Sequence, residues 1–80
     1  MDFKVKSEEL NNKTVIAVFE KESTSYKKFG PQFIGRLVGR TFDKSNHLTK
    51  TVVSLTILAH NYITYQIPCE DVRFISEFFT

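Results

Sequence analysis

Few side chains of this sequence have the type and spacing that catalysis requires. Cys69 could serve as a nucleophile beside His47 or His60, but a free cysteine behaves mostly as a small apolar residue. We therefore interpret Cys69 as a buried thiol beside a turn. The carboxylates of Glu70 and Asp71 are adjacent and point in different directions, which favours a solvated turn or a helix cap over an acid–base pair.

Metal and cofactor motifs are equally sparse. The cysteine and the two histidines lack the paired spacing of zinc ligands. The sequence contains no glycine-rich phosphate loop and no GxSxG motif. We therefore expect no catalytic residue, no metal and no cofactor, and a binding module rather than an enzyme.

The distribution of charge is more informative than its sum. The formal net charge is only +2, yet residues 26–50 hold six cationic side chains against Asp43 alone. Cations contact phosphates and aromatic rings stack on bases, so a mixture of the two is typical of proteins that bind single-stranded nucleic acid. The candidate nucleic-acid-binding residues are Tyr26, Lys27, Lys28, Phe29, Arg36, Arg40 and Lys44.

A second interpretation of the same charge is a basic face that meets the acidic surface of a partner protein. The chain would then be an adaptor or inhibitor that docks through the segment Glu20–Pro31 or through an exposed last strand, with Phe79 at the contact. Short chains of this kind are often encoded by phages or plasmids, which makes a host protein the expected target. The sequence leaves open whether the partner is RNA, single-stranded DNA or a protein.

Alternating apolar side chains predict the elements that carry these residues. The pattern indicates five strands, at Val15–Phe19, Gln32–Phe42, Val53–Ile57, Ile63–Ile67 and Val72–Phe78. In the second strand Arg36 and Arg40 are four residues apart, so regular alternation places both on one face. Gly35 and Gly39 likewise share a face, and two glycines in one strand indicate the sharp bend that closes a small barrel.

The connections complete the prediction. The loop Ala59–Asn61 would set Ile57 opposite Ile63, and its last residue, Asn61, would have a positive φ. Glu20–Pro31 is predicted as a long loop and Pro68–Asp71 as a 3₁₀ turn.

The two ends of the chain carry further predictions. The alternation of Phe3 and Val5 with lysines indicates a short strand, whereas Ser7 would begin a helical turn. In the last strand we expect Phe74 and Phe78 to face the core. Phe79 then points away from the core on an edge strand, where pairing with a second copy would form a homo-oligomer.

Two segments resemble known small barrels. The run FIGRLVG, residues 33–39, resembles the second strand of the Hfq-type bacterial Sm-like family, and DVRFI, residues 71–75, is similar to the end of YolD-like proteins. The resemblance implies a mainly β fold, a five-stranded SH3-like small barrel with a short N-terminal helical turn or extra strand. The Asp43–Asn46 spacing is shorter than in the Hfq pattern and the Tyr65–Val72 interval is longer, so no RNA-contacting residue is carried over.

Length and cysteine content indicate the setting. Eighty residues suit one domain, residues 1–80. A single cysteine forms no internal disulfide, which fits the cytoplasm. No apolar run approaches the roughly 20 residues that a membrane helix needs, so we expect no membrane partner.

Overall fold

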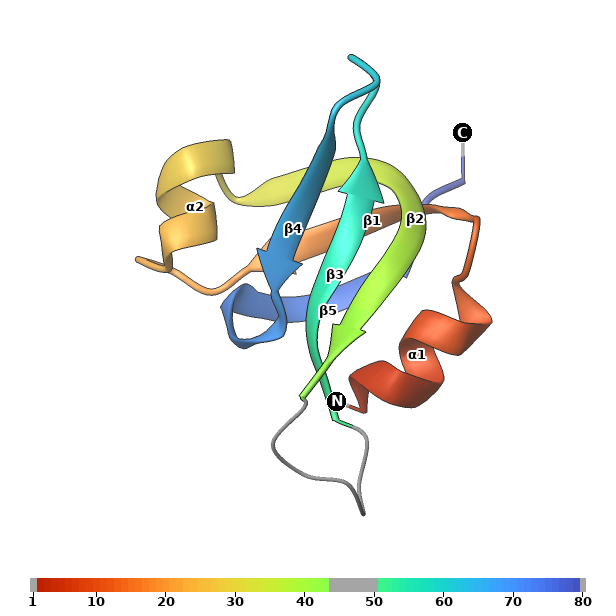
Figure 1. The fold of residues 1–80 in the computed structure, drawn as a ribbon. Coiled ribbons are helices and arrows are strands. Elements are labelled where there is room, and N and C mark those ends of the chain that lie inside the picture. Colours follow the sequence, from red (N-terminus) through yellow and green to blue (C-terminus); the bar gives the residue numbers. More distant parts are fainter. Residues whose placement is uncertain (1, 44–50, 80) are drawn as a thin grey trace.

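The alternating segments form strands in the computed structural model, which describes residues 2–43 and 51–79 (Figure 1). Five antiparallel strands make one sheet with the order β4-β3-β2-β1-β5. A 3₁₀ turn, η1, precedes the last strand, as predicted. The elements are α1 Phe3–Glu9, β1 Thr14–Phe19, α2 Thr24–Phe29, β2 Gln32–Phe42, β3 Val52–Leu58, β4 Thr64–Pro68, η1 Cys69–Asp71 and β5 Val72–Glu77.

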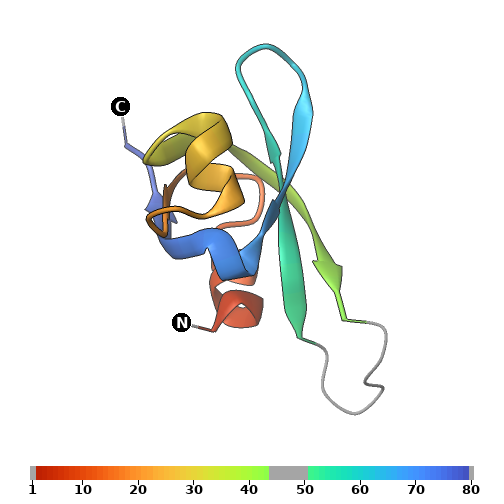
Figure 2. The ribbon, with the colours of Figure 1, turned by 90° about the vertical axis from the view of Figure 1, so that its left-hand side faces the viewer.

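The sheet does not close into the predicted barrel, because its two edge strands, β4 and β5, do not pair. It curves around the long strand β2 instead. Residues 32–36 of β2 pair with β1, and residues 36–42 pair with β3. Figure 2 shows the result: the β3–β4 hairpin stands on one side, and β5 and the two helices lie on the other.

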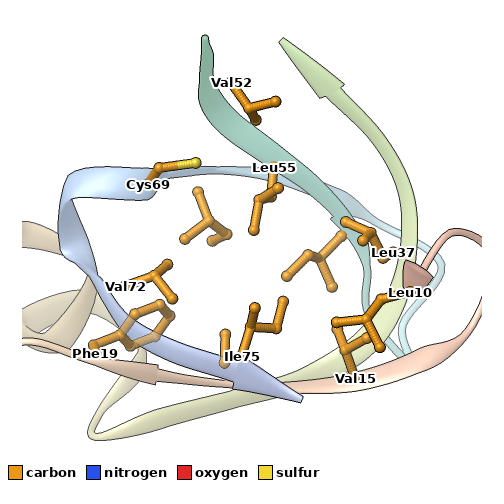
Figure 3. Packing of buried hydrophobic residues seen from close by; sticks show 12 residues of the cluster. Leu10, Val15, Phe19, Leu37, Val52, Leu55, Cys69, Val72 and Ile75 are labelled. Atoms are coloured by element: carbon orange, nitrogen blue, oxygen red, sulfur yellow. The ribbon is translucent and has the colours of Figure 1, made fainter. Parts of the chain in front are cut away.

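The core fills the space inside this curve (Figure 3). Each strand contributes its inward-facing apolar side chains, and burying one large aliphatic side chain contributes about 1.5–3 kcal/mol. The largest fully buried side chains are Val15, Leu37, Leu55, Ile57 and Ile67. They come from four different strands, so the core ties both halves of the sheet together.

The N-terminal segment is a helix rather than a strand. Asp2 caps it, because its Oδ1 accepts hydrogen bonds from the backbone N–H groups of Lys4 (3.0 Å) and Val5 (3.5 Å). Ser7, expected to begin a helical turn, is buried inside α1. The alternation of apolar residues and lysines is too short to outweigh this cap. None of the helices in the described ranges is long and apolar enough to cross a membrane.

The segment Glu20–Pro31 contains the helix α2 where a loop was expected. The Oγ of Ser23 caps α2 by accepting a hydrogen bond from the N–H of Tyr26 at 3.1 Å. Gly30, with a φ of 89°, ends the helix. Its six residues are too few to show a long apolar period, so the alternation pattern did not reveal this helix.

A buried carboxylate anchors α2 to the turn η1. The Oδ2 of Asp71 accepts hydrogen bonds from the Oγ of Ser25 at 2.7 Å and from its N–H at 3.2 Å. The backbone oxygen of Asp71 also accepts a hydrogen bond from the N–H of Glu20 at 2.8 Å. The two oxygens of Asp71 therefore hold the start of α2, and the turn that leads into it, against η1.

The β3–β4 hairpin has the predicted three-residue loop, moved by one position to residues 60–62. The N–H of Ala59 donates to the oxygen of Ile63 at 3.0 Å, and Tyr62 donates to the oxygen of Ala59 at 3.0 Å. Tyr62, and not Asn61, has the positive φ, 64°. The side chain of Asn61 explains the shift, because its Oδ1 accepts a hydrogen bond from the N–H of Ile63 at 3.1 Å.

This shift changes the partners but keeps the faces. Ile57 lies opposite Tyr65 rather than Ile63, and Leu55 lies opposite Ile67. Because the pairing moves by two residues, Ile57 and Leu55 still point into the core. Ile63, no longer part of a strand, is 51% exposed.

Val53 and Phe74 also face away from the core, and for Phe74 this contradicts the prediction. Val52 is buried and Val53 is 43% exposed, because the pairing of β2 with β3 shifts by one residue there. In β5, Ile75 faces the core, whereas Phe74 is 45% exposed and Phe78 is only half-buried. A register shift beside Phe74 again accounts for the difference.

Candidate nucleic-acid interface

The two arginines of β2 do not share a face. Arg36 pairs with Leu58 and Arg40 pairs with Leu55, and residues directly opposed in a sheet point to the same side. Leu55 is fully buried, so Arg40 lies at the rim of the core side, whereas Arg36 lies on the outer side and is exposed. A bulge at Val38 supplies the extra residue that reverses the alternation. The predicted common face is therefore wrong.

Arg40 binds the helix α1 through its guanidinium group. Its Nη1 donates hydrogen bonds to the Oγ of Ser7 at 2.8 Å and to the backbone oxygen of Lys4 at 3.2 Å. Its Nη2 lies 3.6 Å from a carboxylate oxygen of Glu8. The guanidinium also lies 5.1 Å from the centre of the Phe42 ring. Arg40 is thus a structural residue in this conformation.

The two lysines of α2 are exposed, and one of them lies over aromatic rings. The Nζ of Lys28 is 5.2 Å from the centre of the Phe29 ring and 5.6 Å from the centre of the Tyr65 ring. Attraction between a cation and a ring face stabilises this position. Lys27 lies beside it in the last turn of the helix. Both predicted lysines are therefore exposed near the end of α2, and Lys28 is the one that contacts the aromatic rings.

Three aromatic rings pack edge to face beneath Lys28. The centre of the Phe29 ring lies 4.7 Å from that of Phe33 and 5.3 Å from that of Tyr65, and the last two are 5.6 Å apart. Each ring is half-buried. Tyr26, also predicted to contact nucleic acid, packs partly against the core. These contacts fix the rings and leave part of each one accessible.

Two adjoining hollows lie beneath the β3–β4 hairpin. The first, which we call the aromatic hollow, has a volume of about 400 Å³. It is lined by Phe29, Phe33 and Tyr65 together with the polar residues Gln32, His60 and Asn61. The second, which we call the arginine hollow, has a volume of about 420 Å³ and includes Arg36 and Tyr62. Both hollows share Ile34, Ala59 and His60, so they form one continuous surface.

The electrostatic character of this surface is cationic. None of the described residues that line either hollow is acidic. Arg36, Lys27 and Lys28 form no ion pair within the described ranges. A negatively charged ligand would therefore meet attraction from both ends of the surface.

Two predicted residues fall elsewhere. Lys44 lies outside the described residues. Phe79 follows β5 and is 80% exposed. It therefore belongs to the opposite edge of the sheet from the hairpin strand β4.

The sequence did not point to Phe33, Tyr65, His60 and Asn61 as parts of this surface. Phe33 and Tyr65 were assigned only to strands, and the hairpin tip only to a turn. The sequence of the hairpin tip could have indicated a binding site. A tight turn does not need a histidine, an asparagine and a tyrosine together, and these side chains can form hydrogen bonds or ring contacts with a ligand. What could not be foreseen is that α2 would place Phe29 and Lys28 beside Tyr65.

The groups considered for chemistry are arranged unfavourably for it. Burial raises the pKa of the Cys69 thiol from 9.0 to about 11, which keeps it protonated and weakly nucleophilic at neutral pH. Asp71 is engaged with Ser25 rather than with Glu70. Across residues 2–43 and 51–79, no three His, Cys, Asp or Glu side chains gather as a metal site would require. His47 lies outside these ranges.

Comparisons with known proteins identify no relative. The chain shows no significant match to a protein family, to a curated protein or to a solved structure. The structure itself shows a small mainly β protein with a five-stranded antiparallel sheet and a short N-terminal helix. Any function has to be argued from the surface itself.

Proposed function

We propose that this protein is a non-enzymatic accessory module of the cytoplasm that binds single-stranded RNA or DNA through Lys27, Lys28 and Arg36. The observation that carries the proposal is the position of Lys28 over the Phe29 and Tyr65 rings of the aromatic hollow, which adjoins the arginine hollow that Arg36 lines. Cations beside accessible rings contact the two repeating parts of a nucleotide chain, its phosphates and its bases.

The fold that accompanies this proposal is an SH3-like one of the Sm-like kind. Three observations support it: a helix before the first strand, five antiparallel strands in the order β4-β3-β2-β1-β5, and a 3₁₀ turn before the last strand. The proposed site uses the β3–β4 hairpin, α2 and residues of β2, and it rests on no residue taken from that family.

The test is a titration of fluorescent single-stranded oligonucleotides at several salt concentrations. On single strands the logarithm of affinity falls with the logarithm of salt concentration by about 0.7 per phosphate contact, so three contacts give a slope near −2. Lys28→Ala and Arg36→Ala should each weaken binding to all sequences and reduce the slope by about 0.7. Arg73→Ala, an exposed change in β5, is the matched control and should leave the slope unchanged. No binding at low salt, or equal effects of Arg73 and Arg36, would contradict the proposal.

A protein partner is the second candidate, and the open edges of the sheet favour it. Among the described strands, β4 and β5 each pair on one side only. Phe79, just after β5, is 80% exposed. Extended segments of partner proteins add to such edges.

Capture from lysate, with and without nuclease, distinguishes the two functions. A partner protein that remains after nuclease and disappears with Phe79→Ser supports an adaptor or inhibitor. A partner that nuclease removes, and that Arg36→Ala also removes, supports nucleic-acid binding.

A further inference from the structure

The residues that line the aromatic hollow suit the binding of a flat, partly polar ring. Phe29, Phe33 and Tyr65 supply ring surface on one side, and His60 and Asn61 supply hydrogen-bonding groups from the hairpin tip. Its volume of about 400 Å³ lies within the range of roughly 300–1,000 Å³ that is usual for small-ligand sites. Apolar walls with a few placed polar groups are typical of sites that recognise one heterocycle.

From this surface we infer that the aromatic hollow seats one unpaired nucleobase, while Arg36 in the arginine hollow contacts the adjoining phosphate. The inference rests on the proposed function and adds to it the part of the nucleotide that each hollow takes. Ile34, Ala59 and His60 border both hollows, so a base in one and its phosphate in the other are neighbours.

The charge distribution favours a nucleotide over an uncharged aromatic ligand. Arg36 lines one hollow and Lys28 lies above rings of the other, and none of the described lining residues is acidic. A phosphate on either side of the seated base therefore meets a cation. An apolar side chain of a partner protein would form no charge interaction with Arg36 or Lys28.

The rings also favour an unpaired base. A base in a duplex is stacked on both faces and presents only its edges. Contact with the Phe33 or Tyr65 ring requires a base to leave its stack, so single strands and loops supply the ligand.

Hydrogen bonds within the protein position the residues of the aromatic hollow in the absence of a ligand. The Nδ2 of Asn61 donates a hydrogen bond to the Oη of Tyr65 at 3.4 Å. The same side chain accepts a hydrogen bond from the N–H of Ile63 at 3.1 Å, which fixes the hairpin tip. Preorganisation of this kind reduces the entropy lost on binding.

The experiment compares two oligonucleotides of equal length and charge, one with bases and one abasic. If a base occupies the hollow, the abasic strand should bind about tenfold more weakly at each salt concentration, since one stacked base contributes on the order of tenfold or more. The salt slopes of the two strands should agree. Tyr65→Leu should remove the difference between the strands, and Tyr65→Phe, which keeps the ring, should retain it.

The outcomes distinguish the binding of a base in the aromatic hollow from the proposed function, which is nucleic-acid binding as such. Equal affinity for both strands, unaffected by Tyr65→Leu, would overturn the base seat and leave the phosphate contacts of Lys28 and Arg36 standing. No binding of either strand would overturn the proposed function as well. If Tyr65→Leu fails to fold, ring resonances of Phe33 and Tyr65 in the unmodified protein give the answer. They should shift with the base-containing strand and not with the abasic one, and equal shifts would contradict the seat.

Discussion

Two glycines that look equivalent in the sequence have different roles at the residue scale. A Cβ atom at Gly35 would lie 2.6 Å from Cγ2 of Ile57 and 2.6 Å from the backbone oxygen of Leu58. At Gly39 the nearest atom, the Cβ of Thr56, would be 3.5 Å away, which is ordinary contact. Gly35 therefore permits the close approach of β2 to β3 at the point where β2 turns from one neighbour to the other.

Gly35→Ala should consequently destabilise the protein far more than Gly39→Ala. The added methyl group meets backbone that cannot move aside, and overpacking of this kind costs about 1–3 kcal/mol. For a domain of this size that corresponds to a fall in Tm of roughly 4–8 °C for each kcal/mol. Thermal melts followed by circular dichroism measure both variants. Equal melting temperatures for the two would mean that the strand contact at Gly35 adjusts freely.

Cys69 gives a second prediction at this scale, one that depends on pH. Its pKa is raised by burial from 9.0 to about 11, so the unfolded chain loses this proton at lower pH than the native protein. The associated stability is present below pH 9 and is lost as the pH rises toward 11. A thiol reagent at pH 8 should label the native protein slowly and the urea-unfolded chain quickly. Cys69→Ala should flatten the fall in the free energy of unfolding between pH 9 and 11, and an unchanged pH profile would contradict burial as its cause.

At the scale of elements, the positions of these strands were predictable, but the direction in which side chains point was not predictable beside a bulge. The range Gln32–Phe42 was predicted to the residue, because alternation and β-branched side chains mark a strand locally. The bulge at Val38 leaves no such mark, yet it turns Arg40 inward and separates it from Arg36. One unpaired residue thus divided a predicted basic patch into a structural arginine and an exposed one.

Arg40→Ala should therefore loosen α1 without acting on the proposed ligand site. The change removes charge-assisted hydrogen bonds to Ser7 and Lys4, which contribute about 1.5–3 kcal/mol in general and less where water has access. Hydrogen exchange should become faster in α1 and remain unchanged in α2. Oligonucleotide affinity should stay within about twofold, because Arg40 lines neither hollow beneath the hairpin. If Arg40→Ala weakened oligonucleotide binding as much as Arg36→Ala, Arg40 would have to be part of the ligand site, against this prediction.

For the whole molecule, the sequence supported the strand count but not the closure of the sheet. Closure depends on how far β2 curves, and that curvature comes from contacts between residues distant in the sequence, such as Gly35 with Leu58. The candidate site was also only partly predictable, because it too depends on contacts between residues distant in the sequence. Lys28 and Arg36 were identified from charge, whereas Tyr65, the aromatic neighbour of Lys28, lies far along the chain and was brought near by folding.

The open sheet leaves β4 and β5 as free edges among the described strands, and such edges pair readily with other chains. A β4 edge meeting a β5 edge joins different surfaces and generates a ring if the rotation between copies closes or an open filament if it does not, whereas β5 meeting β5 generates a twofold dimer. Both arrangements predict self-association, which Phe79, 80% exposed after β5, would strengthen. Sedimentation at increasing concentration should show species larger than a monomer, and Phe79→Ser should shift them back toward the monomer. Exchange protection gained on association in β4 and β5 together indicates the head-to-tail ring or filament, and protection in β5 alone indicates the dimer. A strict monomer at the highest concentration would mean that neither edge is used between copies, which would leave both edges to a different partner protein.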